Sequence, residues 1–238
     1  MLNNILRILQ IARLFIKYDV DKMLVNCGSG RCKFYFYMLP WNWFRTRRIE
    51  NIPLKIRMMF EELGPIFVKL GQVISTRKDL LPDDVAFELS KLQDNVKPFP
   101  KDISMQIIEK ELGDKISNIF NNFTAEPLAS ASIAQVHSAQ LKNGKDVIVK
   151  VVRPGIHKAI EKDLLLMKRI AEFLTSLSDD FRRMHLIEVV NDYELLVYDE
   201  TDLIKESTNA KKIRDNFKNS KLIYIPEIYW NYVTRNIL

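Results

Sequence analysis

Two features of the sequence could together bind phosphate groups: a run of small residues and a lysine within an apolar run. The small side chains of Ala129, Ala131 and Ala134 would let backbone N–H groups approach the oxygens of a triphosphate. Lys150 follows Val136 by fourteen residues, and its ammonium group could pair with the same oxygens. Small residues alone usually indicate a turn, so the hypothesis of nucleotide binding depends on both features.

The spacing of these residues is that of a protein-kinase phosphate loop and of the strand after it. Ala129, Ala131, Ala134 and Val136 stand where the loop G-x-G-x-x-G-x-V has its three glycines and its valine, and residues 147–150 resemble the V-A-I-K strand. The lysine of that strand binds the α- and β-phosphates and is held by a helical glutamate. Alanine adopts a positive φ less readily than glycine, so we expect a stiffer loop and a different nucleotide pose.

The elements that would position these residues are predicted from turn signals and apolar spacing. Asn143-Gly144 between two alternating runs predicts a β-hairpin of residues 128–141 and 146–152. The other predicted elements are helices over residues 54–63, from 65 onward, 82–92, 101–112, 156–177 and 186–217, and two short strands within residues 222–238. This order predicts an α+β fold.

Composition excludes several classes of protein. The chain has 238 residues, of which 47% are apolar and 28% charged, so it is not intrinsically disordered. Two cysteines cannot form a disulfide framework. Cys27 and Cys32 could supply two metal ligands, but a structural zinc site needs four, so we predict free thiols and no metal site.

The N-terminal segment combines basic and large apolar residues. Residues 1–58 carry a balance of +8, from eleven Lys and Arg against three Asp and Glu, so the remainder of this +6 chain carries −2. Residues 2–18 predict an amphipathic helix with a wide apolar face and a narrow polar stripe of Asn3, Asn4, Arg7, Gln10, Arg13 and Lys17. With the aromatic run at residues 34–44 and the arginines after it, this segment is predicted to bind a membrane surface; the alternative is packing on the protein's own core. Basic residues interleaved with apolar ones argue against nucleic acid as a partner.

Further motifs extend the resemblance to a family. Phe-Val-Lys-Leu-Gly-Gln at residues 67–72 precedes the alanine-rich loop, and Lys-Val-Val-Arg-Pro at residues 150–154 follows it. From about residue 50 to the C-terminus, the chain resembles the UbiB family of atypical protein-kinase-like proteins. The resemblance implies a role in ubiquinone biosynthesis, ATP and Mg²⁺ as cofactors, and a lipid precursor or other ubiquinone-biosynthesis enzymes as partners.

The resemblance also implies roles for individual residues. The implied nucleotide site consists of Ala129, Ser130, Ala131, Ser132, Ile133, Ala134, Gln135, Val136, Lys150 and Glu206, with the serine hydroxyls as additional donors and Glu206 paired with Lys150. The family-specific residues are Lys69, Gly71 and Gln72 of a Lys-x-Gly-Gln motif and Glu200 and Asp202 of a Glu-x-Asp motif. The Lys-x-Gly-Gln helix would cover the cleft where a protein kinase admits a peptide. In isolation, these polar groups would be interpreted as solvated helix faces.

The resemblance divides the chain into an N-terminal segment of residues 1–50, a helical extension of residues 51–122 and a kinase-like N-terminal lobe of residues 123–238. The motifs H-R-D-x-x-x-x-N and D-F-G, which supply the metal ligands and orient the nucleophile, do not occur in the sequence. We therefore expect the second lobe and the family's membrane-spanning tail to lie outside this chain, with no catalytic residue here, weak nucleotide binding and no activity of the chain alone. The expected location is the cytoplasmic face of the bacterial inner membrane. The alternative hypothesis is a non-enzymatic, membrane-associated scaffold module of the ubiquinone pathway.

Overall fold

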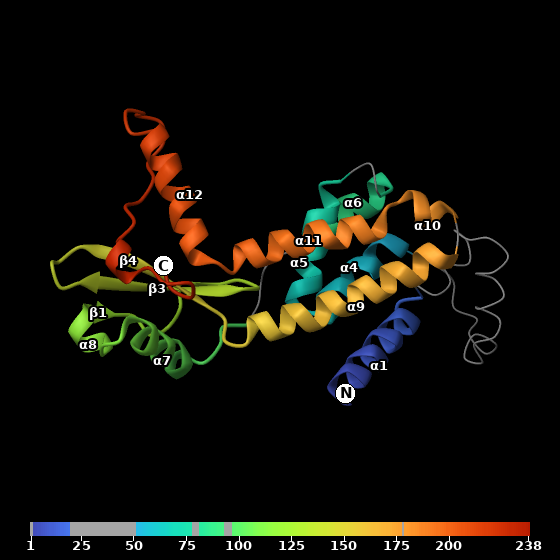
Figure 1. The fold of residues 1–238 in the computed structure, drawn as a ribbon, viewed down its shortest axis with the longest axis horizontal. Helices are drawn as coiled ribbons and strands as arrows, with labels where there is room; N and C mark the ends of the chain where they lie inside the picture. The colour runs from blue at the N-terminus through green and yellow to red at the C-terminus, as the bar shows by residue number, and fades with distance from the viewer. Residues whose placement is uncertain (1, 20–50, 78–80, 93–96, 178) are drawn as a thin grey trace. The chain divides into compact units, whose positions relative to one another are not determined.

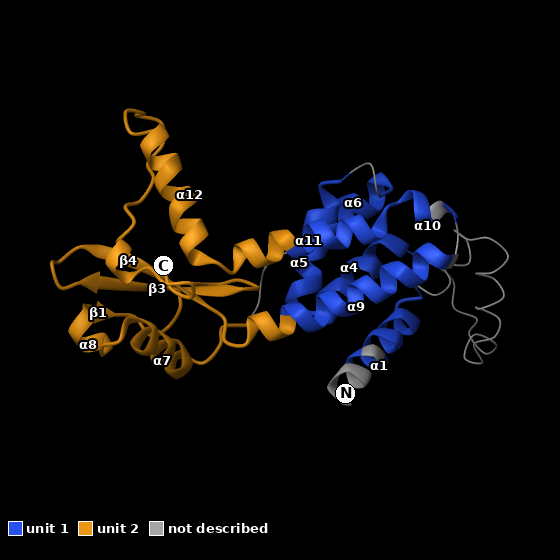
Figure 2. Cartoon of the chain, in the orientation of Figure 1, with its two compact units in different colours: residues 1–94, 160–194 blue, residues 95–159, 195–238 orange. Residues whose placement is uncertain are grey.

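The computed structural model describes residues 2–19, 51–77, 81–92, 97–177 and 179–238 (Figure 1). Cys27, Cys32 and the aromatic run at residues 34–44 lie outside these ranges. The chain forms two compact units: unit 1 comprises residues 1–94 and 160–194, and unit 2 comprises residues 95–159 and 195–238 (Figure 2). The units interleave along the chain because the helices α9 (Ile156–Leu177) and α11 (Leu186–Glu200) each begin in one unit and end in the other.

Unit 1 is built from helices. Besides parts of α9 and α11, it contains α1 (Leu2–Lys17), α4 (Ile52–Leu63), α5 (Pro65–Ser75), α6 (Asp83–Leu89) and α10 (Asp179–Arg183). Pro53 and Pro65 stand in the first turns of α4 and α5, where a missing N–H breaks no helical hydrogen bond. One buried apolar cluster between these helices consists of Val68, Val85, Leu89 and Leu92. The predicted helices of this region are confirmed, although α6 ends three residues earlier than predicted.

The predicted N-terminal helix is α1, and one of its faces packs on unit 1. Ile11, Leu14 and Tyr18 lie three and four residues apart and are buried, whereas Leu9 is 60% exposed. Part of the apolar face that was predicted to meet a membrane therefore packs on the protein itself. Within the described ranges, no helix combines the length and the apolar character that crossing a bilayer requires.

Unit 2 contains a four-stranded antiparallel sheet. Its strands are β1 (Phe120–Phe123), β2 (Ala129–Ser130), β3 (Ala134–Leu141) and β4 (Asp146–Val152), and the other three all pair with β3. Because β4 pairs along nearly the whole of β3, β1 and β2 lie along the opposite edge of β3. The turn between β3 and β4 has Gly144 at a φ of 82°, which glycine adopts without strain. The predicted hairpin is confirmed.

Helices and the C-terminal residues complete unit 2. They are α7 (Lys101–Leu112), α8 (Ile116–Ile119), α12 (Leu203–Asn216) and a 3₁₀ turn (Trp230–Tyr232). Ile108 of α7, Val151 of β4 and Ile237 are at most 1% exposed and belong to one buried cluster. The predicted end of α7 is confirmed, because Gly113 follows it at a φ of 73°.

The helical stretch predicted for residues 186–217 is confirmed, but it is divided into α11 and α12, because the Asp202 side chain caps a new helix start. Another prediction for the C-terminal third is wrong. The two strands predicted within residues 222–238 are not present; that stretch contains the 3₁₀ turn and one bridge between Ile237 and Val151. Leu222 and Tyr224 are 95% and 87% exposed, so their alternation with polar residues does not reflect a half-buried strand.

Candidate functional site

The centre of the candidate site is an ion pair between β4 and α12. The Lys150 Nζ atom lies 2.8 Å from Glu206 Oε1 and 2.7 Å from Oε2. Both residues belong to unit 2, and their side chains are 30% and 41% exposed. The predicted contact between Lys150 and Glu206 is present. It orients the Lys150 ammonium group on the sheet, where solvent reaches it.

An apolar surface lies beside this cation. In antiparallel pairing, opposite residues share a face of the sheet, and Lys150 is opposite Val136 as Ile148 is opposite Ser138. Val149 and Val151 point to the other face and are buried, whereas Ile148 is 62% exposed. The face that carries Lys150 therefore also presents aliphatic side chains to solvent, an arrangement that can contact a flat apolar ring beside a polyanion.

The alanine-rich stretch forms a strand, a tight turn and a strand. The Ala131 N–H donates to the Ala134 carbonyl at 2.8 Å and closes the turn between β2 and β3. Ala129, Ala131 and Ala134 all have negative φ, as expected for residues with a Cβ. Of the residues assigned to the nucleotide site, Ser132, Ile133, Ala134 and Gln135 are buried, while Ala129 and Ala131 are exposed. The Ser132 hydroxyl, at 2% residue exposure, is therefore not offered to solvent.

Arg153 supports this turn, a role that the sequence analysis missed. Its backbone N–H donates to the Ile133 carbonyl at 2.7 Å. One guanidinium nitrogen donates to Ser130 Oγ at 3.2 Å and to the carbonyls of Ala131 at 3.3 Å and Lys97 at 3.1 Å. The only available signal was the position of this arginine, three residues after Lys150 in the Lys-Val-Val-Arg-Pro motif.

Gln135 and His137 form a buried polar chain on the opposite face of β3. Gln135 Oε1 accepts the Phe99 N–H at 3.1 Å, and Gln135 Nε2 lies 3.0 Å from His137 Nε2. His137 Nδ1 lies 3.1 Å from the Thr124 carbonyl, which only accepts, so Nδ1 carries the proton and Nε2 accepts from Gln135. Burial lowers the pKa of His137, and the hydrogen bond to Thr124 opposes this shift. Gln135 therefore acts inside the core and not at the exposed face.

This histidine predicts an acid-sensitive unit 2. The unfolded chain binds a proton at His137 near its ordinary pKa of 6.5, whereas the folded chain binds it only at lower pH. The stability that the neutral ring contributes is therefore complete above about pH 6.5 and is lost as the pH falls through the folded pKa. We expect urea unfolding between pH 7 and pH 5 to show a smaller loss of stability in His137→Gln than in wild type. The matched control is His157→Gln at an exposed histidine, which should keep the wild-type slope; equal slopes in both variants would contradict the prediction.

The Lys-x-Gly-Gln residues lie on α5 in unit 1. Gln72 Nε2 donates to the Leu92 carbonyl at 3.0 Å, and Lys69 is half-buried. A Cβ atom at Gly71 would overlap Leu92 Cδ1 and would lie 2.8 Å from Phe60 Cδ1. These contacts give two of the three motif residues a role in packing α5 against its neighbours within unit 1. The predicted covering of a cleft by this helix concerns both units and stays a prediction.

The close approach at Gly71 predicts a packing defect. Gly71→Ala is expected to lower the free energy of unfolding by about 1–2 kcal/mol, because the Phe60 ring and Leu92 must shift to admit the methyl group. Urea unfolding followed by circular dichroism measures this loss. The double variant with Leu92→Ala should lose less than the sum of the two single variants, since the cavity accommodates the new methyl group; strict additivity would show that the two sites do not compete for space.

The Glu-x-Asp residues lie where α11 ends and α12 begins. Glu200 is the last residue of α11, and the Asp202 carboxylate accepts from the N–H groups of Ile204 and Lys205. This is an N-cap, which satisfies two otherwise unpaired donors of α12. Asp202 thus caps a helix, a role that the sequence motif alone did not indicate.

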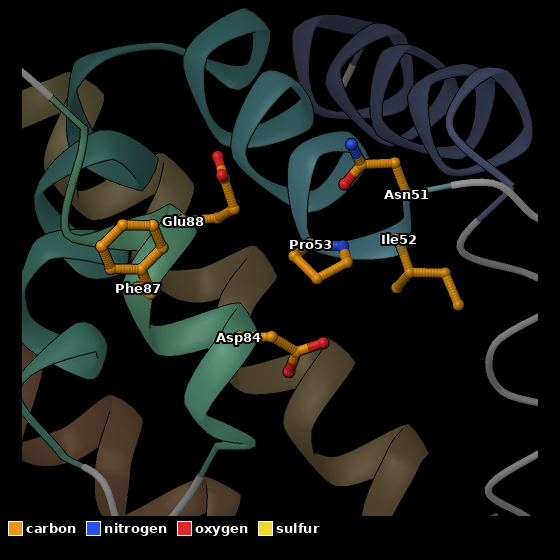
Figure 3. Close-up of a pocket in the computed structure, with 6 residues that line it drawn as sticks. All are labelled: Asn51, Ile52, Pro53, Asp84, Phe87 and Glu88. Carbon is orange, nitrogen blue, oxygen red and sulfur yellow. The ribbon is translucent and has the colours of Figure 1, made fainter.

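A separate cavity of about 470 Å³ lies in unit 1 between the start of α4 and α6 (Figure 3). Its lining consists of Asn51, Ile52, Pro53, Asp84, Phe87 and Glu88. Glu88 already pairs with Arg57 and Lys91. None of the residues predicted for the nucleotide site lines this cavity, so it is not part of the candidate site. Within the described ranges, no three His, Cys, Asp or Glu side chains are grouped so as to hold a metal ion.

Comparison with known proteins gives the chain a family. Residues 91–238 match the model of the ABC1 atypical kinase-like domain. The chain belongs to this family. It is 44% identical over 234 residues to the probable protein kinase UbiB of Pseudomonas fluorescens (strain Pf0-1) and 44% identical over 235 residues to that of Azotobacter vinelandii, in each case across 98% of the chain. The chain spans 44% of the length of each of these relatives.

A solved structure resembles part of the fold. The complex of Rv3197 with erythromycin from Mycobacterium tuberculosis aligns with 74% of the chain and 44% of that protein, at a TM-score of 0.51 and 26% identity. The partial kinase-like α+β fold predicted from the sequence is therefore confirmed.

Proposed function

We propose that this ABC1-family chain carries the nucleotide-facing part of a UbiB-like atypical kinase or ATPase that supports ubiquinone biosynthesis. Its residues would bind Mg-ATP through the turn between β2 and β3 and through Lys150. The single observation that carries the proposal is the ion pair of Lys150 and Glu206 on a solvent-accessible sheet face. Such a pair holds a lysine ready for phosphate oxygens in kinase-type sites.

The other residues of this face fit the same ligand. The exposed Ile148 and the half-buried Val136 can contact an adenine ring, while the small side chains of the exposed Ala129 and Ala131 leave room for phosphates beside the turn. Mg²⁺ would have to be held largely by the phosphates, since the acidic groups of kinase metal sites belong to motifs absent from this sequence. For the same reason we expect weak binding and no magnesium-dependent turnover by this chain alone.

A nucleotide titration of the purified chain tests the proposal. In ¹H–¹⁵N NMR spectra, Mg-ATP is expected to shift the signals of residues 129–136, Lys150 and Glu206, and inorganic phosphate is expected to shift them less. Shifts confined to unit 1, or none at saturating Mg-ATP, would overturn the nucleotide site. Magnesium-dependent ATP hydrolysis at micromolar Mg-ATP would overturn the expectation of weak binding without turnover.

A membrane surface is the partner that we propose for the N-terminal segment, at the cytoplasmic side of the bacterial inner membrane. Leu9 is 60% exposed on α1, and Arg13 is exposed four residues further on, so an apolar side chain and a cation remain accessible after α1 has packed. The non-enzymatic scaffold alternative uses the same surface.

Lipid binding through α1 predicts a charge-sensitive interaction. In co-sedimentation with vesicles that contain anionic lipid, the double variant Leu9→Glu/Arg13→Glu is expected to bind severalfold less than wild type, because it removes an apolar contact and reverses a charge. Lys218→Glu/Leu222→Glu, at two exposed positions in unit 2, changes the net charge by the same amount and is the charge-matched control. An equal loss in both variants, or no loss in either, would contradict a role of α1.

A further inference from the structure

The junction between α11 and α12 is built around Asp202. Its carboxylate Oδ1 accepts the N–H groups of Ile204 at 3.1 Å and of Lys205 at 3.3 Å. Its own carbonyl accepts the N–H of Glu206 at 3.2 Å, the first intrahelical bond of α12. The backbone of Asp202 is extended, at a φ of −104° and a ψ of 94°, as N-cap residues are. This one residue therefore determines where α12 begins and contacts the backbone of Glu206.

The residues on either side of Asp202 fix the junction in unit 2. Thr201 is 2% exposed and donates from Oγ1 to the Tyr198 carbonyl at 2.8 Å. Leu203 is fully buried, and its N–H donates to the Arg235 carbonyl at 3.2 Å. The start of α12 is thus held by packing on one side and by the C-terminal residues on the other.

The same C-terminal residues also bind β4. The Val152 N–H donates to the Asn236 carbonyl at 2.9 Å, and Lys150 and Leu238 exchange two backbone hydrogen bonds of 2.6 and 3.1 Å. Residues 235–238 therefore contact both the strand that carries Lys150 and the helix start that precedes Glu206. Lys150 is held by β4, which is fixed in the sheet. The distance between Lys150 and Glu206 therefore depends on where and how α12 begins.

We infer that Asp202 is a positioning residue for the ion pair of Lys150 and Glu206, and that it acts by capping α12 and not by contact with a nucleotide or a metal ion. Without the cap, the first turn of α12 loses two hydrogen bonds and frays, and Glu206 lies within reach of that fraying. Only the consequence for nucleotide binding depends on the proposed function; the positioning of the pair does not.

Chemical labelling of Lys150 tests the inference without nucleotide. The rate of acetylation of each lysine by acetic anhydride is measured by mass spectrometry, with Lys142 as the internal reference at an exposed turn. Asp202→Ala is expected to accelerate labelling of Lys150 about five-fold, the change in equilibrium that a typical lost N-cap produces. Asp202→Asn and Asp202→Ser cap well without a charge and should restore the wild-type rate, whereas Asp202→Glu keeps the charge on a longer side chain and should behave as Asp202→Ala does. Asp199→Asn, which removes a nearby exposed carboxylate that pairs with Lys205, is the matched control and should leave the rate unchanged.

The pattern of rescue decides between a cap and a direct role. If Asp202→Asn and Asp202→Ser label as fast as Asp202→Ala, the carboxylate charge itself is required and the inference is overturned. An unchanged Lys150 rate in Asp202→Ala overturns it as well. If the alanine variant does not fold, Asp202→Glu compared with Asp202→Asn gives the same decision. If the wild-type chain binds no nucleotide while Asp202→Ala accelerates labelling and Asp202→Asn and Asp202→Ser restore the wild-type rate, the proposed function is refuted and the positioning role stands.

Discussion

Replacing Lys150 by methionine is expected to weaken the binding of a fluorescent ATP analogue at least tenfold while the chain stays folded. A hydrogen bond to a charged group contributes about 1.5–3 kcal/mol, and a factor of ten corresponds to about 1.4 kcal/mol. Methionine has a similar length without the charge, so Glu206 would also be left unpaired and would repel the phosphates. The fold should tolerate the change, since a partly exposed ion pair contributes about 1 kcal/mol or less to stability.

Two further variants make this prediction specific. Glu206→Gln should weaken binding severalfold but less than Lys150→Met does, because the glutamine oxygen still accepts a hydrogen bond from the lysine and no charge opposes the phosphates. Lys145→Met removes an exposed lysine from the same hairpin, 3.5 Å from Glu227 Oε2, and should leave the affinity unchanged. Equal losses in Lys150→Met and Lys145→Met would show that the ligand responds only to net charge.

The sequence predicted the parts of this site that depend on local signals. Asn143-Gly144 specified the tight turn, and that turn with the alternating runs beside it placed Lys150 on a strand next to Val136. The partner of Lys150 is 56 residues away, on a helix whose start no periodicity indicated. Only the family resemblance supplied Glu206, because spacing along a chain does not determine which distant elements meet.

The sequence failed where tertiary contacts override a pattern. Residues 186–217 have helical spacing throughout, yet the side chain of Asp202 competes with the helix for backbone donors and starts a second one. β1, with the sequence Phe-Asn-Asn-Phe, was not predicted. Asparagine disfavours strands, and the pairing of β1 with β3 compensates for this low propensity. Arg7 was assigned to a polar stripe of α1, but its guanidinium makes a two-point contact with a carboxylate 156 residues away.

That contact predicts the largest stability effect in unit 1. Arg7 Nε donates to Oδ1 of Asp163 on α9 at 2.9 Å, and Arg7 Nη2 donates to Oδ2 at 2.9 Å. The same Nη2 atom also donates to the Leu63 carbonyl at 2.7 Å. The two side chains are only 15% and 11% exposed. Removing one member leaves the other charge buried with poor compensation, which typically costs about 3–5 kcal/mol. Asp163→Ala is therefore expected to lower the free energy of unfolding by about 3 kcal/mol, measured by urea denaturation.

The double variant distinguishes a loss caused by an unpaired buried charge from a loss caused by the changed side-chain volume at Asp163. Arg7→Leu/Asp163→Leu removes both charges and should recover most of the lost stability, because buried ion pairs are often no more stabilising than apolar residues of similar volume. Asp179→Ala breaks the exposed pair with Arg182 in the same unit and should cost about 0.5 kcal/mol or less. Hydrogen exchange of the α1 amides reports whether this helix stays packed. These amides should exchange faster in Asp163→Ala and at the wild-type rate in the double variant. If the double variant were as unstable as Asp163→Ala, the loss would not come from an unpaired buried charge, and the prediction would be contradicted.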